Sequence, residues 1–271
     1  MPHLTALLKP LLIWLKLPES SQLCDLDNPE NIHILRHIIQ RKPFLRNVYL
    51  SFYQDILTRI KTVPPDGNIV ELGSGASFMK HLAPHIITSD VLSYEGVDKT
   101  FSALEMPFQD SSISAFVMVD VFHHIKDSRL FLKEMNRCLK PGGKVVMIEP
   151  ANTPWSRFIY QNFHHEPFEP EKGWGFTDGG PLTGANMALP WIVFCRDRQQ
   201  LTTEFSELQL SNIDIHTPIR YLLSGGLSVR QLLPSFLYPL VSLVELVLSP
   251  LNFMIGMFMT VELHKTCISE G

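Results

Sequence analysis

The stretch Asn68–Ser77 reads NIVELGSGAS. An apolar strand ends here at Glu71 and continues into a turn that contains Gly73 and Gly75. Because glycine has no Cβ, the chain can bend tightly at this turn and a ligand can lie directly on the backbone. A helix-compatible segment, FMKHL, follows. The pattern predicts a strand, a turn and a helix that bind a nucleotide-type cofactor, although a G-x-G turn is weak when it stands alone.

Two more strands are expected after this turn. The stretch His85–Val91 is rich in β-branched residues and carries Asp90 near its end. Nucleotide-binding folds place an acid that hydrogen-bonds ribose hydroxyls at a similar distance from the glycine turn. The apolar stretch Ser114–Val121 carries Asp120 near its end. The sequence therefore predicts two strands that each deliver a carboxylate to the same edge of a sheet.

A helix and another strand follow. The stretch Ser128–Leu139 has apolar residues at helical intervals and charged residues between them. Pro141 and two glycines then end the helix, and Lys144–Ile148 is expected to form a buried strand that is followed by Glu149. Strands that alternate with helices in this way predict an α/β fold with a mostly parallel sheet.

Three segments, taken in order, resemble one known family. They are Glu71–Ser77 (ELGSGAS), Ala103–Ile125 (ALEMPFQDSSISAFVMVDVFHHI) and Arg129–Pro150 (RLFLKEMNRCLKPGGKVVMIEP). Together they are similar to the class I S-adenosylmethionine-dependent methyltransferases, in particular the type 11-like small-molecule group with a D-A-x-x-L-P-F motif. The resemblance extends over Asn68–Pro150, and the ordered set is more specific than any single segment.

The resemblance implies a Rossmann-like, seven-stranded, mostly parallel sheet with one antiparallel strand, and S-adenosyl-L-methionine as the cofactor. It implies that the methionine end of the cofactor lies over Gly73 and Gly75, that the ribose hydroxyls bind Asp90, and that adenine lies near Ala103. The residues that the resemblance assigns to the cofactor are Glu71, Gly73, Ser74, Gly75, Asp90, Ser102, Ala103, Leu104, Asp120 and Val121.

Two positions depart from the family pattern. Ser77 stands where the family usually has a third glycine, and Ser102 stands where relatives often have an Asp that accepts a bond from the adenine amino group. A hydroxyl accepts such a bond more weakly than a carboxylate does. The segment between Asp90 and Ala103 is also short, so the helix usually found there is expected to be lost or reduced to a turn.

Composition excludes several classes of function. The chain has 271 residues and a net charge of −4, without a cluster of Lys and Arg, so nucleic acid is not expected as a partner. The cysteines Cys24, Cys138, Cys195 and Cys267 show neither a metal-binding spacing nor a paired pattern. This usage is typical of a reducing cytoplasm and predicts neither disulfides nor a metal site.

The N-terminal part, residues 1–66, is expected to form a helical cap in front of a methyltransferase domain at residues 67–271. Leu4–Leu17 is apolar but lacks the charged start and small-residue cleavage site of a secretory signal. We interpret it as a helix that lies against the core or a membrane surface, or as part of the cap. Asp25–Thr62 has apolar residues on helical faces, which predicts amphipathic helices.

An apolar insertion, residues 217–253, separates the last two expected strands, Leu208–His216 and Met254–Leu263. The class I fold pairs these strands as an antiparallel hairpin. Prolines and Glu245 interrupt every stretch of the insertion that is long enough to span a membrane. A helical lid or a partner surface is the default interpretation, and peripheral membrane contact is the alternative. A lid of such residues favours a methyl acceptor with an apolar portion.

The candidate catalytic residues form two groups. His123 and His124 follow the strand that ends near Asp120, and histidine can remove a proton from an acceptor near neutral pH. The alternative is structural: one histidine packs and bonds backbone while the other lines the pocket. His165 and Glu166 form the second group, in a stretch dense in aromatic and ionisable residues that could line a substrate pocket or pack as a helix.

The sequence therefore favours a cytoplasmic S-adenosylmethionine-dependent methyltransferase that acts on a small or lipid-linked acceptor. A nicotinamide-dependent oxidoreductase shares the glycine turn, but the L-P-F and P-G-G motifs and the lack of a Tyr-x-x-x-Lys pair disfavour it. A non-catalytic, membrane-associated interaction protein on a methyltransferase scaffold is the second alternative. The residues do not indicate whether oxygen, nitrogen or carbon receives the methyl group.

Overall fold

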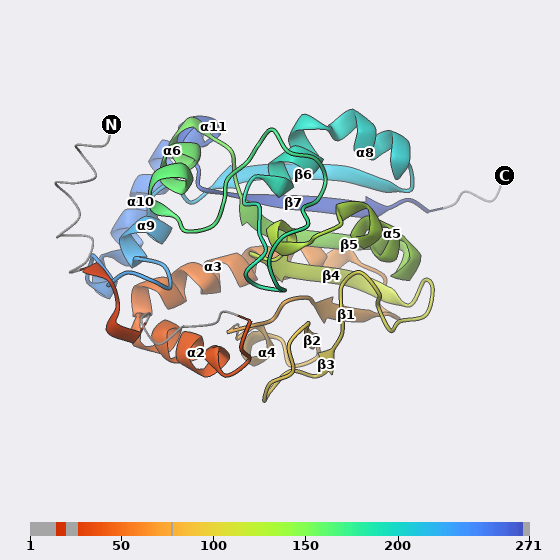
Figure 1. Cartoon of the computed structure of the whole chain (residues 1–271), viewed down its shortest axis with the longest axis horizontal. Helices are drawn as coiled ribbons and strands as arrows, with labels where there is room; N and C mark the ends of the chain where they lie inside the picture. The colour runs from red at the N-terminus through yellow and green to blue at the C-terminus, as the bar shows by residue number, and fades with distance from the viewer. Residues whose placement is uncertain (1–14, 20–26, 77, 268–271) are drawn as a thin grey trace.

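The computed structural model describes residues 15–19, 27–76 and 78–267. A seven-stranded sheet with the strand order β3-β2-β1-β4-β5-β7-β6 forms its centre (Figure 1). β7 runs antiparallel to both of its neighbours, and the other paired strands are parallel. The expected α/β sheet with one antiparallel strand is confirmed. The strands are β1 (Asn68–Glu71), β2 (Ile87–Asp90), β3 (Lys99–Thr100), β4 (Ile113–Val119), β5 (Leu139–Pro150), β6 (Leu208–His216) and β7 (Phe258–Lys265).

Helices cover the sheet, and several gather at the end where β4 and β5 finish (Figure 1). Those at this end include α6, α9, α10 and α11, while α5 lies toward the other end. The helices are α2 (Asn31–Arg41), α3 (Pro43–Arg59), α4 (Met79–Leu82), α5 (Ser128–Cys138), α6 (Pro154–Phe163), α7 (Leu189–Trp191), the π-helix η4 (Ile192–Arg196), α8 (Arg198–Glu204), α9 (Arg220–Ser224), α10 (Tyr238–Leu248) and α11 (Asn252–Ile255); short 3-10 turns are η2 (Ile60–Thr62), η3 (Phe122–His124), η5 (Ser235–Leu237) and η6 (Ser249–Leu251).

The core lies on both faces of the central strands. Phe116, Val117 and Met118 of β4 are fully buried, as is the middle of β5. Strands buried on both faces need continuous apolar runs, which explains why both strands read as uninterrupted hydrophobic sequence. The amphipathic helices bury their apolar faces against this sheet: Phe131 of α5 and Val48 of α3 are both fully buried.

Some boundaries differ from those expected. β5 begins at Leu139 because the Pro-Gly-Gly segment joins the strand through an irregularity opposite Ile113, with Gly142 at a φ of +77°. β7 begins at Phe258 rather than Met254 because Asn252–Ile255 is helical. The short segment between Asp90 and Ala103 contains β3 and no helix, as its length predicted. Ser77, Cys24 and most of Leu4–Leu17 lie outside the described residues.

The insertion leaves the sheet and returns to it at the same place. His216 at the end of β6 pairs with Phe258 at the start of β7, so the intervening chain begins and ends side by side. A segment that crossed a membrane once would leave β7 on the opposite side, away from β5 and β6. In this structure the insertion instead packs on the N-terminal helices: Tyr238 Oη donates to the carbonyl of Asn47 at 3.0 Å, and Lys42 Nζ donates to the carbonyl of Val229 at 2.6 Å.

Candidate active site

The glycine turn after β1 has the conformation that its sequence requires. Gly73 has a φ of +59° and Gly75 a φ of +47°, a region that residues with a side chain rarely adopt. A Cβ at Gly73 would lie only 2.5 Å from Val121 Cγ2. The turn therefore passes so close to the chain after β4 that only glycine fits.

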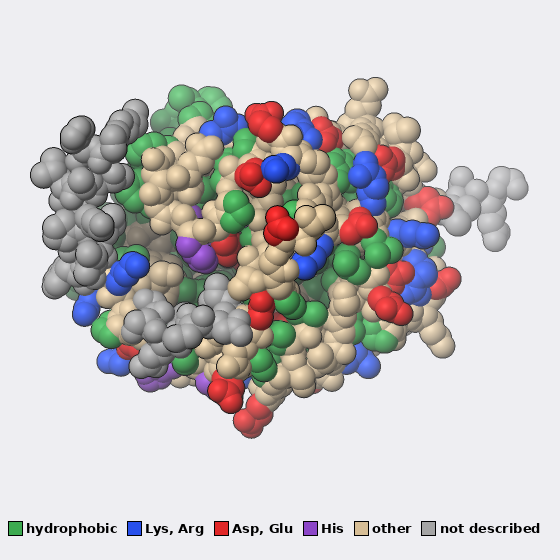
Figure 2. All heavy atoms as spheres, viewed as in Figure 1, with side chains coloured by type: hydrophobic (Ala, Val, Ile, Leu, Met, Phe, Trp, Pro, Cys, Tyr) green, Lys and Arg blue, Asp and Glu red, His purple; other side chains and the backbone are tan. Residues whose placement is uncertain are grey.

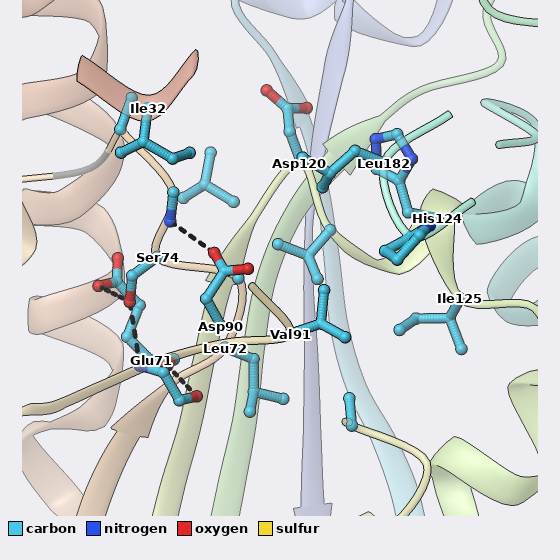
Figure 3. Close-up of a pocket in the computed structure, with 18 of the residues that line it drawn as sticks. Ile32, Glu71, Leu72, Ser74, Asp90, Val91, Asp120, His124, Ile125 and Leu182 are labelled. Carbon is cyan, nitrogen blue, oxygen red and sulfur yellow. Dashed lines mark hydrogen bonds between the residues drawn. The ribbon is translucent and has the colours of Figure 1, made fainter. Parts of the chain in front are cut away.

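Two buried acids hold this turn in place (Figure 3). Glu71 Oε2 accepts a hydrogen bond from Ser74 Oγ at 2.7 Å, and Asp90 Oδ2 accepts one from the Gly75 amide at 2.9 Å. Tyr94 Oη donates to the same Asp90 oxygen at 2.9 Å. The carboxylate expected to bind ribose thus also links β2 to the glycine turn.

A cavity of about 420 Å³ opens at the ends of β1, β2 and β4. The strand order changes direction between β1 and β4, which is where open α/β sheets bind their ligands. All ten residues that the sequence assigned to the cofactor line this cavity. No local motif in the sequence marks the apolar wall of this cavity. The wall includes Ile32, Leu35, Ile39, Tyr49, Tyr53, Leu182 and Leu227.

Ser102 occupies the position where the resemblance expected a weakened adenine contact. Its Oγ accepts a hydrogen bond from the Leu104 amide at 3.2 Å, so the hydroxyl stabilises its own turn. Phe101 packs edge-on against Phe108, with ring centroids 5.4 Å apart. This side of the cavity therefore offers backbone and apolar surface rather than a carboxylate.

Asp120 lies at the end of β4 in a backbone conformation with a φ of +55°. Such a conformation is uncommon for a residue with a side chain and is found often at functional sites. Burial raises the pKa of its carboxyl to about 7, although the nearby His123 opposes this shift. Figure 3 shows Asp120 and His124 across the cavity from Ser74 and Glu71.

Glu149 organises the turn that carries the paired histidines. Its Oε1 accepts hydrogen bonds from the amides of Val121 and Phe122 at 2.8 and 2.7 Å, and its Oε2 bonds to His123 Nδ1 at 2.8 Å. The Glu149 side chain is fully buried. From the sequence, Glu149 is only the residue that follows an expected strand. Its hydrogen-bond partners lie more than twenty positions away in the chain, so no local pattern indicates its role.

Four histidines surround the carboxylate of Glu166. The atoms nearest its two oxygens are His123 Nε2 at 3.5 Å, His124 Nε2 at 3.8 Å, His165 Nε2 at 3.6 Å and His164 Nδ1 at 3.9 Å. The structure thus joins the two groups of candidate bases, which are forty residues apart in the sequence. Among the candidate catalytic residues His123, His124, His165 and Glu166, only His124 lines the cavity.

The charges in this cluster differ from residue to residue. Burial opposes the charge on His123, but the carboxylates of Glu149 and Glu166 outweigh it and raise the pKa of His123 to about 10. Burial, assisted by the charge of His123, lowers the pKa of His124 to about 4. Burial opposes the charge of Glu166, yet its histidine partners lower its pKa to about 2. Burial likewise lowers the pKa of His164 to about 4, so His124 and His164 are both neutral imidazoles near neutral pH.

The stretch after β5 packs only in part. Tyr160 is buried and donates to the carbonyl of Met257 at 2.6 Å. Trp155, Phe158 and Phe163 are 37–45% exposed. The interpretation in which these three residues and Tyr160 all pack into the core is therefore wrong. The glycine-rich segment at residues 173–184 contributes Leu182 to the cavity, and its Gly184 carbonyl accepts from His124 Nδ1 at 2.9 Å. It is part of the site and not merely a connection.

Comparison with known proteins bears on this arrangement. Residues 81–147 match the family model described as a methyltransferase domain. The crystal structure of geranyl diphosphate C-methyltransferase from Streptomyces coelicolor A3(2), in complex with Mg²⁺, geranyl diphosphate and S-adenosyl-L-homocysteine, is similar with a TM-score of 0.51 and 13% identity, over 82% of this chain and 81% of that one. The chain therefore has a Rossmann-like methyltransferase fold, and its residues 81–147 are similar to a methyltransferase domain.

A curated relative of this chain is the demethylmenaquinone methyltransferase of Staphylococcus aureus. The two are 33% identical over 92 residues, which is 34% of this chain and 36% of the relative. The chain thus spans about a third of the length of the curated relatives that it matches.

Proposed function

We propose that the chain transfers the methyl group of S-adenosylmethionine to a small or lipid-linked acceptor with an apolar portion. One observation carries this proposal: a single cavity joins the glycine turn and Asp90 to apolar walls from the N-terminal helices and the insertion. The close approach at Gly73 supports a cofactor that lies directly on the backbone, because the chain has excluded a side chain there.

The residues of the cavity suit the parts of this cofactor. Asp90 would accept from a ribose hydroxyl with the carboxylate lone pair that the Gly75 amide, the Leu92 amide and Tyr94 leave available. Ala103 and Leu104 would flank adenine. When bound, the cofactor would supply an electrophilic sulfonium methyl carbon to an electron pair of the acceptor, with the electrons of the broken carbon–sulfur bond left on sulfur. The chain's own tasks are alignment and exclusion of water.

His124 is the residue that we propose as the base for an acceptor that must lose a proton. It lines the cavity, and its lowered pKa leaves the imidazole neutral near pH 7. Its Nδ1 is held by the Gly184 carbonyl, so its Nε2 is the nitrogen that would take the proton. His123 would act on His124 through its charge, and His165 lies outside the cavity lining with its side chain 61% exposed.

The acceptor class follows from the walls of the cavity. Ile32, Leu35 and Ile39 come from the N-terminal helix α2, and Leu227 comes from the insertion. These side chains offer apolar contact and no hydrogen bonds. The relative named demethylmenaquinone methyltransferase supports an acceptor of lipid-like character.

We also propose that the insertion contacts a membrane surface. The helical residues Ser235–Ile255 are long and apolar enough to cross a membrane by length and composition, but only 11% of the most apolar window is buried. Glu245, the sole charged residue in this range, points inward and binds Arg220. Figure 2 shows hydrophobic side chains at the upper left, over this end of the molecule. The residues of this apolar surface are Phe236, Leu240, Leu243, Val244, Leu246, Val247, Leu251, Phe253 and Met254.

Two measurements test the proposed activity. Calorimetric titration of the full chain should show binding of S-adenosylhomocysteine and none of NADH. Incubation with labelled S-adenosylmethionine and separate lipid and soluble extracts should transfer label to the lipid fraction. Asp90→Asn should reduce cofactor affinity at least about tenfold, whereas Tyr94→Phe, which keeps the carboxylate, should reduce it less. Binding of NADH, or an unchanged affinity in Asp90→Asn, would contradict the assignment.

A further inference from the structure

We propose that His123, His124 and Glu166 bind a divalent transition-metal ion beside the cofactor cavity. Each residue offers one ligand atom, and these atoms all lie within 4.8 Å of one another. The proposal does not depend on methyl transfer, and it is an alternative to the base role of His124, because an ion on Nε2 would occupy the lone pair that takes the proton. It replaces the expectation of no metal, which rested on cysteine spacing alone.

The separations suit ligands around a shared ion. Metal–ligand bonds of about 2.0–2.2 Å in tetrahedral geometry place neighbouring ligand atoms about 3.3–3.6 Å apart. Glu166 Oε2 lies 3.5 Å from His123 Nε2, and Glu166 Oε1 lies 3.8 Å from His124 Nε2. Both distances exceed the usual length of an N–H···O hydrogen bond, about 2.7–3.2 Å. Small movements would bring all three atoms to an ion between them.

The other nitrogen of each imidazole is already held by the protein. His123 Nδ1 bonds to Glu149 Oε2 at 2.8 Å, and His124 Nδ1 donates to the Gly184 carbonyl at 2.9 Å. Metal-binding histidines almost always have such a bond to a carboxylate or carbonyl, because it fixes the ring and directs the opposite nitrogen at the metal. Here both Nε2 atoms are directed toward the same carboxylate.

Glu149 is itself fixed, which makes this support rigid. The amides of Val121 and Phe122 donate to its Oε1 at 2.8 and 2.7 Å. The two histidines therefore belong to a short turn whose backbone is tied to the carboxylate that orients one of their rings. A site that is prepared in this way loses little entropy when an ion binds.

The ligand set indicates the kind of ion. Two imidazoles and one carboxylate suit Zn²⁺, Fe²⁺, Co²⁺ or Mn²⁺ better than Mg²⁺ or Ca²⁺, which prefer oxygen ligands. His165 Nε2 lies 3.6 Å from Glu166 Oε1 on an exposed side chain and could add a fourth ligand. Because His124 lines the cavity, the ion would lie beside the wall of the cavity that this residue forms.

Metal titration of the full chain, freed of metal with a chelator and without cofactor, tests the site. One equivalent of Co²⁺ should bind with visible absorption typical of four or five ligands, and Zn²⁺ should displace it. Glu166→Gln and His124→Gln should each weaken Co²⁺ binding at least about tenfold. His37→Gln is the matched control, because His37 is an exposed histidine of α2, and it should bind like the wild type.

Two further results decide between a built site and surface binding. X-ray absorption of the wild-type Zn²⁺ form should show at least two imidazole ligands, a readout that needs no variant to fold. Circular dichroism of each variant should show that it is folded before its affinity is compared. Equal Co²⁺ affinity in wild type, Glu166→Gln and His124→Gln, or absorption with fewer than two imidazoles, overturns the proposal. Neither result would change the outcome of the S-adenosylhomocysteine titration. The metal site and the cofactor site are therefore tested independently of each other.

Discussion

At the scale of single residues, Gly73 sets the position of the cofactor turn. Gly73 has a φ of +59°, and a Cβ at this position would lie 2.5 Å from Val121 Cγ2. A side chain would therefore strain the backbone and also collide with Val121, which follows β4. The residue after Gly73 is tied to β2, because the Ser74 amide donates to the Ser89 carbonyl at 2.9 Å. The turn therefore cannot move away from Val121 without breaking that bond.

Gly73→Ala should accordingly weaken S-adenosylhomocysteine binding at least about tenfold and destabilise the fold by about 1–3 kcal/mol. Calorimetry and thermal unfolding measure the two effects. Gly173→Ala is the matched control, since a Cβ at Gly173 meets nothing within 4 Å and should change neither value. A Gly73→Ala protein with wild-type affinity would show that the cofactor does not lie on this turn.

At the scale of elements, the strands and helices with strong local patterns were predictable and their long-range contacts were not. The bounds of β6 agree with the expected Leu208–His216, because alternation and flanking turns mark them locally. The convergence of His124 and Glu166 has no local signal, since it depends on how the chain after β5 folds back over β4. The same holds for Leu227, which reaches the cavity only because the insertion packs on α3.

His216 joins three of these elements. It ends β6, its Nε2 bonds to Thr260 Oγ1 of β7 at 2.9 Å, and its ring lies 5.6 Å from that of Phe52 in α3. Burial lowers the pKa of His216 to about 4, although Asp55 opposes this shift. The histidine is therefore neutral in the folded chain at pH values where the unfolded chain protonates it.

This shift predicts a loss of stability in mild acid. Below pH 6.5 the unfolded state binds a proton that the folded state refuses, so the free energy of unfolding falls as the pH drops from 6.5 toward 4, by at most about 3 kcal/mol from this residue. His124 and His164 shift in the same direction. Denaturant unfolding of wild type and His216→Gln at pH 7 and pH 5 measures the contribution of His216. Between pH 7 and pH 5 the free energy of unfolding should fall more in the wild type than in the variant. Equal losses would contradict it.

At the scale of the whole molecule, the cavity lies at the ends of β1, β2 and β4, and α10 and α11 gather with other helices at the end of the sheet where β4 and β5 finish (Figure 1). The insertion contributes to both, through Leu227 in the cavity and through exposed side chains such as Leu246 and Val247 outside. An acceptor dissolved in a lipid layer would then have a short path from that layer to the cavity.

Flotation with phosphatidylcholine and phosphatidylglycerol vesicles tests this arrangement. The double variant Leu246→Glu, Val247→Glu should bind vesicles at least about tenfold more weakly, because both side chains are more than two-thirds exposed and each loses apolar transfer energy. Leu130→Glu is the control, since Leu130 lies on α5 toward the other end of the molecule and is 41% exposed. If all three proteins float equally, or none floats, the insertion does not mediate membrane contact.

The adjacency of His216 and Phe258 has a consequence for how such a chain diversifies. Since the insertion begins and ends next to two residues that face each other across the β6–β7 hairpin, a tight reverse turn or a different segment could replace it without altering the register of either strand. The length and composition of the insertion can therefore change while the seven strands of the sheet keep their pairing.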